Sequence, residues 1–455
     1  MAYVFLLFLC VLSVVSEKTT FVNVKITLSS KKQQDLSEQV VITTKNLPSS
    51  IKNYNPDIYD AIKIEHQVLP IVYGNAFQNL NTSHLAIVDT DLKEFEPGAF
   101  NDLKRLETLT VGANLLKSIR KGIFNNLPIT KLYLDDNKIK VIEGGSFDGM
   151  HRLTHIVLSM NKIRVLERGL FRDLAELTSI RLDFNKIERI EEMAFQNLPN
   201  LHRLDLDNNN LKILQATSLV NLPTLTVLLL QVNELESISL KNLDSLAVLW
   251  LYENKLKKWD MHMLNDLKSV KKINATNNNI GVLDCTCSNG FDVEFFDLSY
   301  NKIKNISEGC FNGSTIEHLK LSNNKISNIS VESFHSANIK ELHLQNNLIT
   351  EIKNGTFANL QMSQLLLENN QIVDIETGAF ENSTFQSINL DGNKLRSIRH
   401  GVFDNTKVAF ISILRNDGIN ERAFNNVSNL WDSKSDTNKL DVRRTTDKVL
   451  ADEPF

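Results

Sequence analysis

The sequence is poor in cysteine and proline and has no excess of either charge. Its 455 residues include four cysteines and eight prolines, and the formal net charge is −4. A nearly balanced charge argues against nucleic acid as a partner, because nucleic-acid-binding proteins carry a basic surface. Catalytic motifs are missing too: there is no G-x-S-x-G, no H-E-x-x-H and no phosphate-binding glycine loop. We therefore predict that the protein is not an enzyme and holds no cofactor or metal.

Only one long apolar run is present, MAYVFLLFLCVLSVVS at residues 1–16. It is too short to span a bilayer and precedes polar residues, which is typical of a secretory signal peptide cut after Ser16, although no lysine or arginine precedes the run. The alternative is a buried N-terminal helix. No later segment is apolar enough for a membrane span, and the C-terminus has no hydrophobic tail for a lipid anchor. We expect a secreted, extracellular protein that loses Cys10 with the signal peptide.

What the sequence does contain is a repeat. The segments LTHIVLSMNKIRVL (153–166), LTSIRLDFNKIERI (177–190) and LHRLDLDNNNLKIL (201–214) share the pattern L-x-x-L/I-x-L-x-x-N-x-I/L. Extending the alignment gives sixteen units, spaced mostly by 23 or 24 residues. The residues at the asparagine position are Gln67, Thr90, Asn114, Asn137, Asn161, Asn185, Asn209, Asn233, Asn254, Asn278, Asn301, Asn324, Asn347, Asn370, Asn393 and Asn416. A fixed period of this length predicts a solenoid with one unit per coil.

Each unit supplies a short strand whose side chains alternate between the core and the outside. In the unit of Asn185, for example, Ile180 and Leu182 face inward. One unit cannot bury its apolar face alone, so stacked units share a core and pair their strands into a parallel sheet. The asparagine follows the strand, where backbone groups lose their ladder partners, and its amide can both donate and accept hydrogen bonds. We predict a column of asparagines that satisfies those groups in successive coils.

A phenylalanine usually follows the asparagine by ten residues. This row consists of Phe77, Phe100, Phe124, Phe147, Phe171, Phe195, Phe311, Phe334, Phe357, Phe380 and Phe403. Because its spacing equals the period of the core, we interpret it as an aromatic spine on the far side of the core rather than as a cofactor site.

These units resemble the leucine-rich repeat family, specifically the type with 23 or 24 residues per repeat that is common in secreted and cell-surface proteins. Toll-type receptor ectodomains, slit-type guidance proteins and secreted insect immune proteins are similar in this respect. For residues 61–431 the resemblance implies an α/β solenoid, a curved horseshoe of about 16 repeats. It also implies a parallel β-sheet on the concave face, loops or short helical turns on the convex face, and a concave face that binds another protein.

The ends of the chain depart from that family. Cysteine-rich caps are absent at both ends. The alternating segment FVNVKITL (21–28) and the strand-like VVITTKNL (40–47) predict a cysteine-free cap within residues 17–60 that pairs onto the first repeat. Residues 432–455 are polar, which predicts a disordered tail. The tail has no heptad pattern, so we do not expect pairing through a coiled coil.

Outward-facing strand positions are the candidates for partner binding, because the fold leaves them free to vary. In the middle units they hold large apolar residues, and a cluster of such residues typically marks a protein contact site. We predict a contact surface of Tyr133, Asp135, Met160, Asp183, Phe184, Asp207, Leu229, Trp250 and Tyr252, with Val157, Asp205 and Val232 among them. Its acidic residues suit a basic partner. The alternative is an ordinary solvated face.

Eight N-x-S/T sequons predict glycosylation, and seven of them lie at or after residue 274. They are Asn81, Asn274, Asn305, Asn312, Asn328, Asn354, Asn382 and Asn426. Asn274 occupies an outward strand position, so a glycan there would confine protein contacts to the N-terminal half. The alternative is that Asn274 carries no glycan.

The mature chain would keep three cysteines, Cys285, Cys287 and Cys310. Cys287 and Cys310 each follow the asparagine of their unit by nine residues, so they occupy equivalent positions in consecutive coils. Neighbouring strands lie about 4.8 Å apart, which is within reach of a disulfide. We predict a Cys287–Cys310 disulfide that leaves Cys285 available to a partner chain, although register alone also allows Cys285 to pair with Cys310. A zinc site would need a suitably spaced histidine, which is missing.

Together these patterns favour a secreted, glycosylated recognition protein that binds an extracellular protein ligand, in innate immunity. A structural or adhesive matrix component, a soluble receptor-type ectodomain and an enzyme inhibitor are the alternatives. The sequence does not name the ligand.

Overall fold

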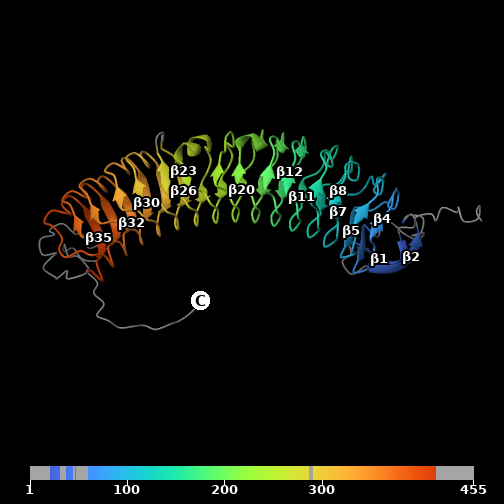
Figure 1. Ribbon diagram of the computed structural model, residues 1–455, viewed down its shortest axis with the longest axis horizontal. Coiled ribbons are helices and arrows are strands. Elements are labelled where there is room, and N and C mark those ends of the chain that lie inside the picture. The colour runs from blue at the N-terminus through green and yellow to red at the C-terminus, as the bar shows by residue number, and fades with distance from the viewer. Residues whose placement is uncertain (1–20, 31–36, 45–46, 48–59, 286–289, 417–455) are drawn as a thin grey trace, which may run out of the picture. The chain divides into compact units, whose positions relative to one another are not determined.

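The computed structural model describes residues 21–30, 37–44, 47, 60–285 and 290–416. The chain divides into two compact units, and each builds a stack of coils with one main-sheet strand per coil (Figure 1). The first unit runs to Asn210 and includes Thr217–Leu222, and the second consists of Leu211–Ala216 and the residues from Pro223 onward. The expected signal peptide (1–16) and tail (432–455) lie outside the described residues.

The first unit begins with an antiparallel pair. Its main sheet consists of β1 (Phe21–Ser29), β2 (Ser37–Thr44), β3 (Ala61–Glu65), β5 (His84–Val88), β7 (Thr108–Thr110), β9 (Lys131–Tyr133), β11 (His155–Val157), β14 (Ser179–Arg181) and β17 (Arg203–Asp205). Strand β1 pairs antiparallel with both β2 and β3. From β3 onward the pairs are parallel. Val24, Ile26 and Leu28 of β1 are buried, so this strand covers the apolar edge of the first coil.

The main-sheet strands of the second unit become longer along the chain. They are β20 (Val227–Leu229), β22 (Val248–Trp250), β24 (Lys272–Asn274), β26 (Asp292–Asp297), β28 (Thr315–Lys320), β30 (Asn338–His343), β32 (Gln361–Leu366), β34 (Thr384–Asn389) and β35 (Lys407–Ser412). Each of these strands pairs parallel with the next. Strands β20, β22 and β24 have three residues each, whereas those from β26 onward have six.

Short strands line the rest of each coil. In the first unit they are β4 (Ile71–Val72), β6 (Glu94–Phe95), β8 (Ser118–Ile119), β10 (Val141–Ile142), β12 (Val165–Leu166), β13 (Phe171–Arg172), β15 (Arg189–Ile190), β16 (Phe195–Gln196) and β19 (Leu219–Val220). In the second unit they are β18 (Ile213–Leu214), β21 (Ser237–Ile238), β23 (Lys258–Asp260), β25 (Val282–Asp284), β27 (Asn305–Ile306), β29 (Asn328–Ile329), β31 (Glu351–Ile352) and β33 (Asp374–Ile375). The helical elements whose bounds the structure describes are the 3-10 turns η1 (Ala216–Ser218) and η2 (Met261–Asp266).

The predicted asparagine column is confirmed. The Asn185 side chain accepts a hydrogen bond from Ile163 N at 3.1 Å and donates to Leu158 O at 2.9 Å and Leu182 O at 3.0 Å. Its amide therefore joins the preceding coil to its own. Asn324 in the second unit accepts from Ile303 N at 3.0 Å in the same way. These buried amides satisfy backbone groups where the strand ladder ends.

The aromatic spine is confirmed as well. In the first unit the ring of Phe171 stacks on Phe147 at 5.6 Å and on Phe195 at 5.3 Å between centroids. In the second unit the rings of Phe311, Phe334, Phe357, Phe380 and Phe403 stack in the same manner. Where this row lapses, the buried Trp259 packs against Phe296 at 5.5 Å and contributes the missing aromatic volume.

Candidate protein-binding surface

The outer face of each main sheet is formed by alternate strand residues and by the residue directly before each ladder asparagine. We call the latter the left-handed position, because its φ lies between 50° and 64° in every coil from Ala113 to Gly392. In this position the chain turns inward while its N–H still binds the next coil, as Phe184 N does to Asp207 O at 3.2 Å. Only glycine, and to a lesser degree asparagine and aspartate, adopts this conformation readily. The position is therefore one at which a bulky side chain strains the backbone.

Two consecutive coils of the first unit place large apolar residues at the left-handed position. Met160 has a φ of 56° and a side chain that is 55% exposed. Phe184 has a φ of 54° and is 50% exposed. Met160 N donates to Asp183 O at 3.0 Å, so the two coils are in register at this point. These side chains neither fill the core nor suit their backbone conformation, which makes them the strongest candidates for a binding role.

The acidic residues of the predicted surface are less accessible than expected. Asp183 and Asp207, predicted to be outward contacts, are both buried, and so is Asp205. Asp183 accepts a hydrogen bond from Ser159 Oγ at 2.6 Å and one from Arg181 Nε at 3.3 Å. The expectation of exposed acids was wrong here because neighbouring polar side chains hold the carboxylates in the sheet face, Ser159 and Arg181 in the case of Asp183.

Asp205 and Asp207 also have unusual electrostatics. Arg203 Nε donates to Asp205 Oδ2 at 3.0 Å, and Asn208 Nδ2 donates to Asp207 Oδ2 at 2.8 Å. Burial raises the pKa of Asp205, and the carboxylates of Asp207 and Asp183 raise it further against the opposing effect of Arg203. Burial and Asp183 also raise the pKa of Asp207. The fold thus keeps carboxylates at a place where their ionised form is disfavoured.

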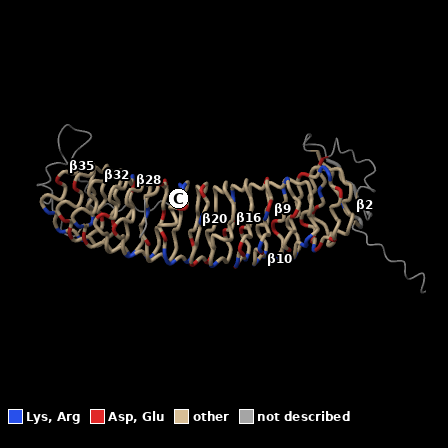
Figure 2. The backbone as a smooth tube through the Cα atoms, turned by 90° about the horizontal axis from the view of Figure 1, so that it is seen from above, with Lys and Arg blue, Asp and Glu red and all other residues tan. Residues whose placement is uncertain are grey.

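The remaining predicted residues of the first unit lie at the rim of this surface. Tyr133 and Asp135 are partly exposed. Tyr133 pairs in register with Val157, which in turn pairs with Arg181. Charged residues of both signs occur along the coils of each unit (Figure 2). The first unit therefore combines exposed apolar side chains with buried acids on one sheet face.

In the second unit the predicted residues differ in exposure. Leu229 is buried, so the structure does not present it as an exposed contact; it pairs in register with Trp250. Trp250 is exposed, and its ring lies 6.2 Å from that of the partly exposed Tyr252. Cross-strand neighbours in one row lie close enough to remove surface from solvent, and Leu229 has the large Trp250 as such a neighbour.

Sequence reasoning missed Tyr300. This residue occupies the left-handed position of its coil with a φ of 56° and is 59% exposed. Its N–H donates to Ser322 O at 3.0 Å, as the pattern requires. On the same face Lys320 Nζ lies 4.9 Å from the centroid of the Phe295 ring. A bulky residue before the ladder asparagine is the sequence signal that would have found Tyr300.

Family models match the chain in two parts. The model described as "Leucine rich repeat" matches residues 128–187 and 175–235, and "BspA type Leucine rich repeat region (6 copies)" matches residues 304–431. This protein belongs to the leucine-rich repeat family. A comparison with curated proteins finds no match.

Solved structures of leucine-rich repeat proteins are similar to this chain. Drosophila Toll in the Toll–Spätzle complex is 21% identical, with a TM-score of 0.46 over 73% of this chain and 50% of Toll. A chain of the LRIM1/APL1C complex is 19% identical, with a TM-score of 0.50 over 71% and 55% of the two chains. A leucine-rich repeat protein of Leptospira interrogans is 21% identical, with a TM-score of 0.43 over 76% and 93%. This chain thus spans about half the length of the first two.

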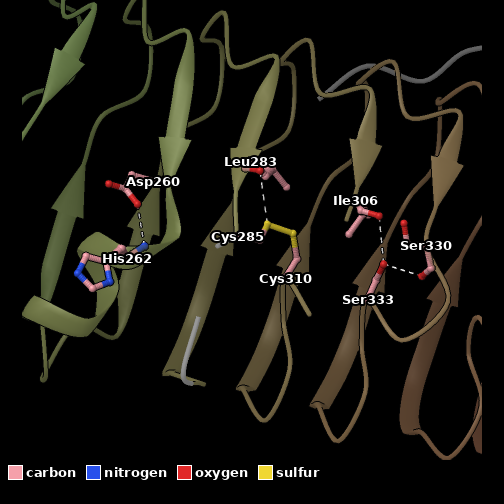
Figure 3. Close-up of a disulfide and its surroundings, with 8 residues drawn as sticks. All are labelled: Asp260, His262, Leu283, Cys285, Ile306, Cys310, Ser330 and Ser333. Atoms are coloured by element: carbon pink, nitrogen blue, oxygen red, sulfur yellow. Dashed lines mark hydrogen bonds between the residues drawn. A yellow bond between two sulfur atoms is a disulfide. The ribbon is translucent and has the colours of Figure 1, made fainter. Parts of the chain in front are cut away.

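The leucine-rich repeats contain a disulfide, but not the predicted one. Cys285 bonds to Cys310, with their Cα atoms 4.8 Å apart (Figure 3). The predictions of a Cys287–Cys310 bond and of a Cys285 thiol for a partner chain were therefore wrong. Cys285 follows Asn278 by seven residues and Cys310 follows Asn301 by nine, so the two bonded cysteines do not occupy equivalent positions of their repeats. Cys287 lies outside the described residues.

Among the residues that the structure describes, the predicted glycosylation sites are exposed except for Asn274. Asn81, Asn305, Asn312, Asn328, Asn354 and Asn382 are exposed, and Asn426 lies outside the described residues. Asn274 ends β24 on the sheet face, is partly buried, and accepts hydrogen bonds from Thr276 N at 3.1 Å and Thr276 Oγ1 at 2.8 Å. Its amide oxygen is thus held by the threonine of its own sequon.

Metal-binding and membrane-spanning features do not occur in the described part of the repeats. It contains no group of three or more His, Cys, Asp or Glu side chains arranged to hold a metal ion. Within the same residues, no helix has the length and apolar character needed to cross a membrane.

Proposed function

We propose that this protein is an extracellular recognition protein that binds another protein through the outer face of its sheets. Met160 and Phe184 are the main contacts of the first unit, with Tyr133 and Asp135 at the rim. One observation carries the proposal: two adjacent coils hold large, half-exposed apolar side chains at the left-handed position, where the fold favours small polar residues. Strain of this kind persists where a residue has a role outside the fold.

In the second unit, Trp250 and Tyr252 are the corresponding contacts. Their rings adjoin on neighbouring positions of one coil, and Trp250 is exposed. Tryptophan and tyrosine are enriched among the residues that contribute most to protein–protein binding. A glycan on Asn274 would lie beside this pair, because Trp250 and Asn274 pair in register. Binding through the second unit therefore requires that Asn274 is not glycosylated.

An extracellular location and a role in innate immunity complete the proposal. A disulfide and exposed sequons suit an oxidising secretory environment, and residues 1–16 serve as the signal peptide. LRIM1 is found in complex with APL1C in a solved structure that shares this fold. Transcript levels after infection test the role: induction is expected, whereas unchanged levels with steady expression during development would favour an adhesive matrix component.

Affinity capture with variants tests the binding surface. Full-length protein, purified from secreted material, serves as bait in extracellular fluid of the source organism, beside Phe184→Asn and Trp250→Ala forms that thermal melts show to be folded. We expect a partner that the wild type retains and Phe184→Asn does not. Equal recovery of every captured protein by wild type, Phe184→Asn and Trp250→Ala would refute the proposed surface.

A further inference from the structure

The three buried acids of the first unit form a cluster directly beside the proposed apolar contacts. This carboxylate cluster consists of Asp183, Asp205 and Asp207. Asp183 precedes Phe184 in the sequence, and its carbonyl binds Met160 N at 3.0 Å, so the cluster and the apolar pair share one part of the sheet face. A partner that covers Met160 and Phe184 therefore lies next to these carboxylates, which are buried in the free protein.

The cluster has more negative than positive charge. Two guanidinium groups form ion pairs with carboxylates of the cluster. Arg181 Nε lies 3.3 Å from Asp183 Oδ1 and 3.7 Å from Asp205 Oδ2. Arg203 Nε lies 2.8 Å from Asp205 Oδ1. Arg181 and Arg203 are themselves about half exposed and can move. Their positive charge leaves one carboxylate of the cluster uncompensated.

Asp205 supplies a second observation that points to a ligand. This residue is 3% exposed, yet its Oδ1 atom accepts no hydrogen bond from any residue that the structure describes, because the nearby Arg203 Nε–H is directed at Oδ2. A buried carboxylate oxygen without a donor is costly, and an ionised carboxylate can only accept. Arg203 Nε lies 2.8 Å from Oδ1 but directs its N–H at Oδ2, so Oδ1 lacks a well-directed donor, which a further cationic group would supply together with the missing charge.

The fold does not require an acid in this row. Tyr133 and Val157 occupy the same strand position as Asp205 in coils of the same unit, and each coil pairs in register with the next. An apolar residue is thus compatible with the position. Burial and neighbouring carboxylates raise the pKa of Asp205, which shows that ionisation there is unfavourable in the isolated protein.

We propose that the carboxylate cluster receives an arginine or lysine side chain of the partner protein, whose apolar neighbour packs on Met160 and Phe184. This inference rests on the proposed protein-binding function and names the chemistry of the partner. A guanidinium group fits best because its planar set of donors can serve two carboxylates at once. The occupant is an organic cation, since the described residues provide no metal-binding group of three such side chains.

A selection from a random peptide library displayed on phage tests the proposal on the full-length glycoprotein. The wild type should enrich peptides in which arginine or lysine adjoins an aromatic or aliphatic residue. The affinity of a selected peptide is then measured against Asp205→Asn and Asp207→Asn. Each should weaken binding about 10- to 100-fold, as expected for loss of a charged hydrogen bond. The matched control is Asp136→Asn, which removes an exposed charge from a left-handed position of the same unit and should leave affinity unchanged.

The peptide can be changed as well, so the test does not depend on the folding of any variant. Replacement of its arginine by the neutral isostere citrulline should weaken binding to the wild type by a similar factor. In Asp205→Asn the same replacement should have little further effect, because the two changes remove one interaction. Citrulline peptides that bind the wild type as tightly as arginine peptides would overturn the inference.

The outcomes separate this inference from the proposed function. Peptides that depend on Phe184 but contain no basic residue would overturn the cationic partner and leave the binding surface standing. Equal losses of affinity in Asp205→Asn and Asp136→Asn would show that only the net charge of the protein matters, and would also overturn the inference of a cationic partner. If no enriched peptide loses affinity in Phe184→Asn, both the inference and the proposed surface fail.

Discussion

The left-handed positions of the first unit and of the C-terminal coils hold different residues on the same backbone. At Met160 and Phe184 the position is bulky and apolar, whereas Asn323, Asn346, Asn369 and Gly392 hold the residue types that this conformation favours. All have a positive φ close to 55° or 60°. The asparagines and glycine of the C-terminal coils are the residues that this backbone conformation favours. The bulky residues at 160 and 184 depart from that preference, which indicates a role other than stabilising the fold.

Strand length follows the same division. Strands β11 and β14 have three residues, whereas β28, β30, β32 and β34 have six and add pairs such as Gln361 with Thr384. The C-terminal repeats from Asn278 onward are also uniformly 23 residues long. Met160 and Phe184 lie in coils with three-residue strands, whereas the exposed Tyr300 lies in the coil of the six-residue β26.

The largest effect should come from the disulfide at the start of these regular coils. Cys310→Ser opens the Cys285–Cys310 bond and should lower the free energy of unfolding by about 3 kcal/mol, because the reduced unfolded chain gains conformational freedom. Urea denaturation measures the loss. Cys287→Ser is the matched control and should leave stability unchanged; a loss as large as that of Cys310→Ser would contradict the observed pairing.

Loss of a ladder asparagine should affect both regions alike. Asn185→Ala and Asn324→Ala each leave buried backbone groups without partners and should cost about 1–3 kcal/mol. The two side chains make the same hydrogen bonds, with Asn324 donating to Leu298 O at 3.0 Å and to Leu321 O at 3.1 Å. A loss confined to one of the two variants, measured by urea denaturation, would show that the regions differ in more than their surfaces.

An exchange at the left-handed position tests the comparison directly. Phe184→Asn should raise the free energy of unfolding by up to about 1 kcal/mol, and Asn323→Phe should lower it by about 1 kcal/mol, because only the latter introduces backbone strain. Thermal melts of both variants measure this. If Asn323→Phe is neutral, bulky residues at this position are not strained, and the central argument for Met160 and Phe184 is lost.

The smallest effect concerns pH. The pKa of Asp205 and that of Asp207 are raised in the folded state, so the folded protein holds these protons more tightly than the unfolded chain does. Stability should therefore fall as pH rises from the ordinary value near 3.8 through the raised folded values, and the loss should persist at neutral pH. Asp205→Asn should make the stability curve flatter across this window. A steeper curve in the variant would show that Asp205 stabilises the fold as an ion.

Periodic features were predictable from the sequence, because the core imposes them on every coil. Asn185 and Phe171 recur at the spacing of the coil, and their hydrogen bonds and ring stacking follow from that spacing alone. The local departures were not predictable. Asp183 is held by Ser159 and Arg181, which depends on the side chains of particular neighbours, and Cys285 bonds to Cys310 although the two differ in their distance from the ladder asparagine.

The candidate surface was predictable in part. Alternation correctly placed Phe184 and Trp250 on the outer face, but it did not predict how exposed each outward residue is, since Leu229 is buried beside the exposed Trp250. Nor does alternation distinguish an ordinary outward position from a left-handed one. Tyr300 was missed for that reason, since its identity matters only once its backbone conformation is known.

The left-handed row has a consequence for how new specificities could arise. Its backbone N–H and carbonyl groups are held by neighbouring coils, as in the bond from Tyr300 N to Ser322 O, whatever the side chain is. Each coil thus has one surface residue at the left-handed position that can be exchanged, and its substitution leaves the backbone hydrogen bonds between coils in place. Bulky residues substituted for Asn323, Asn346 and Asn369 could form a second recognition surface on the C-terminal coils, at a stability cost of about 1 kcal/mol per bulky residue.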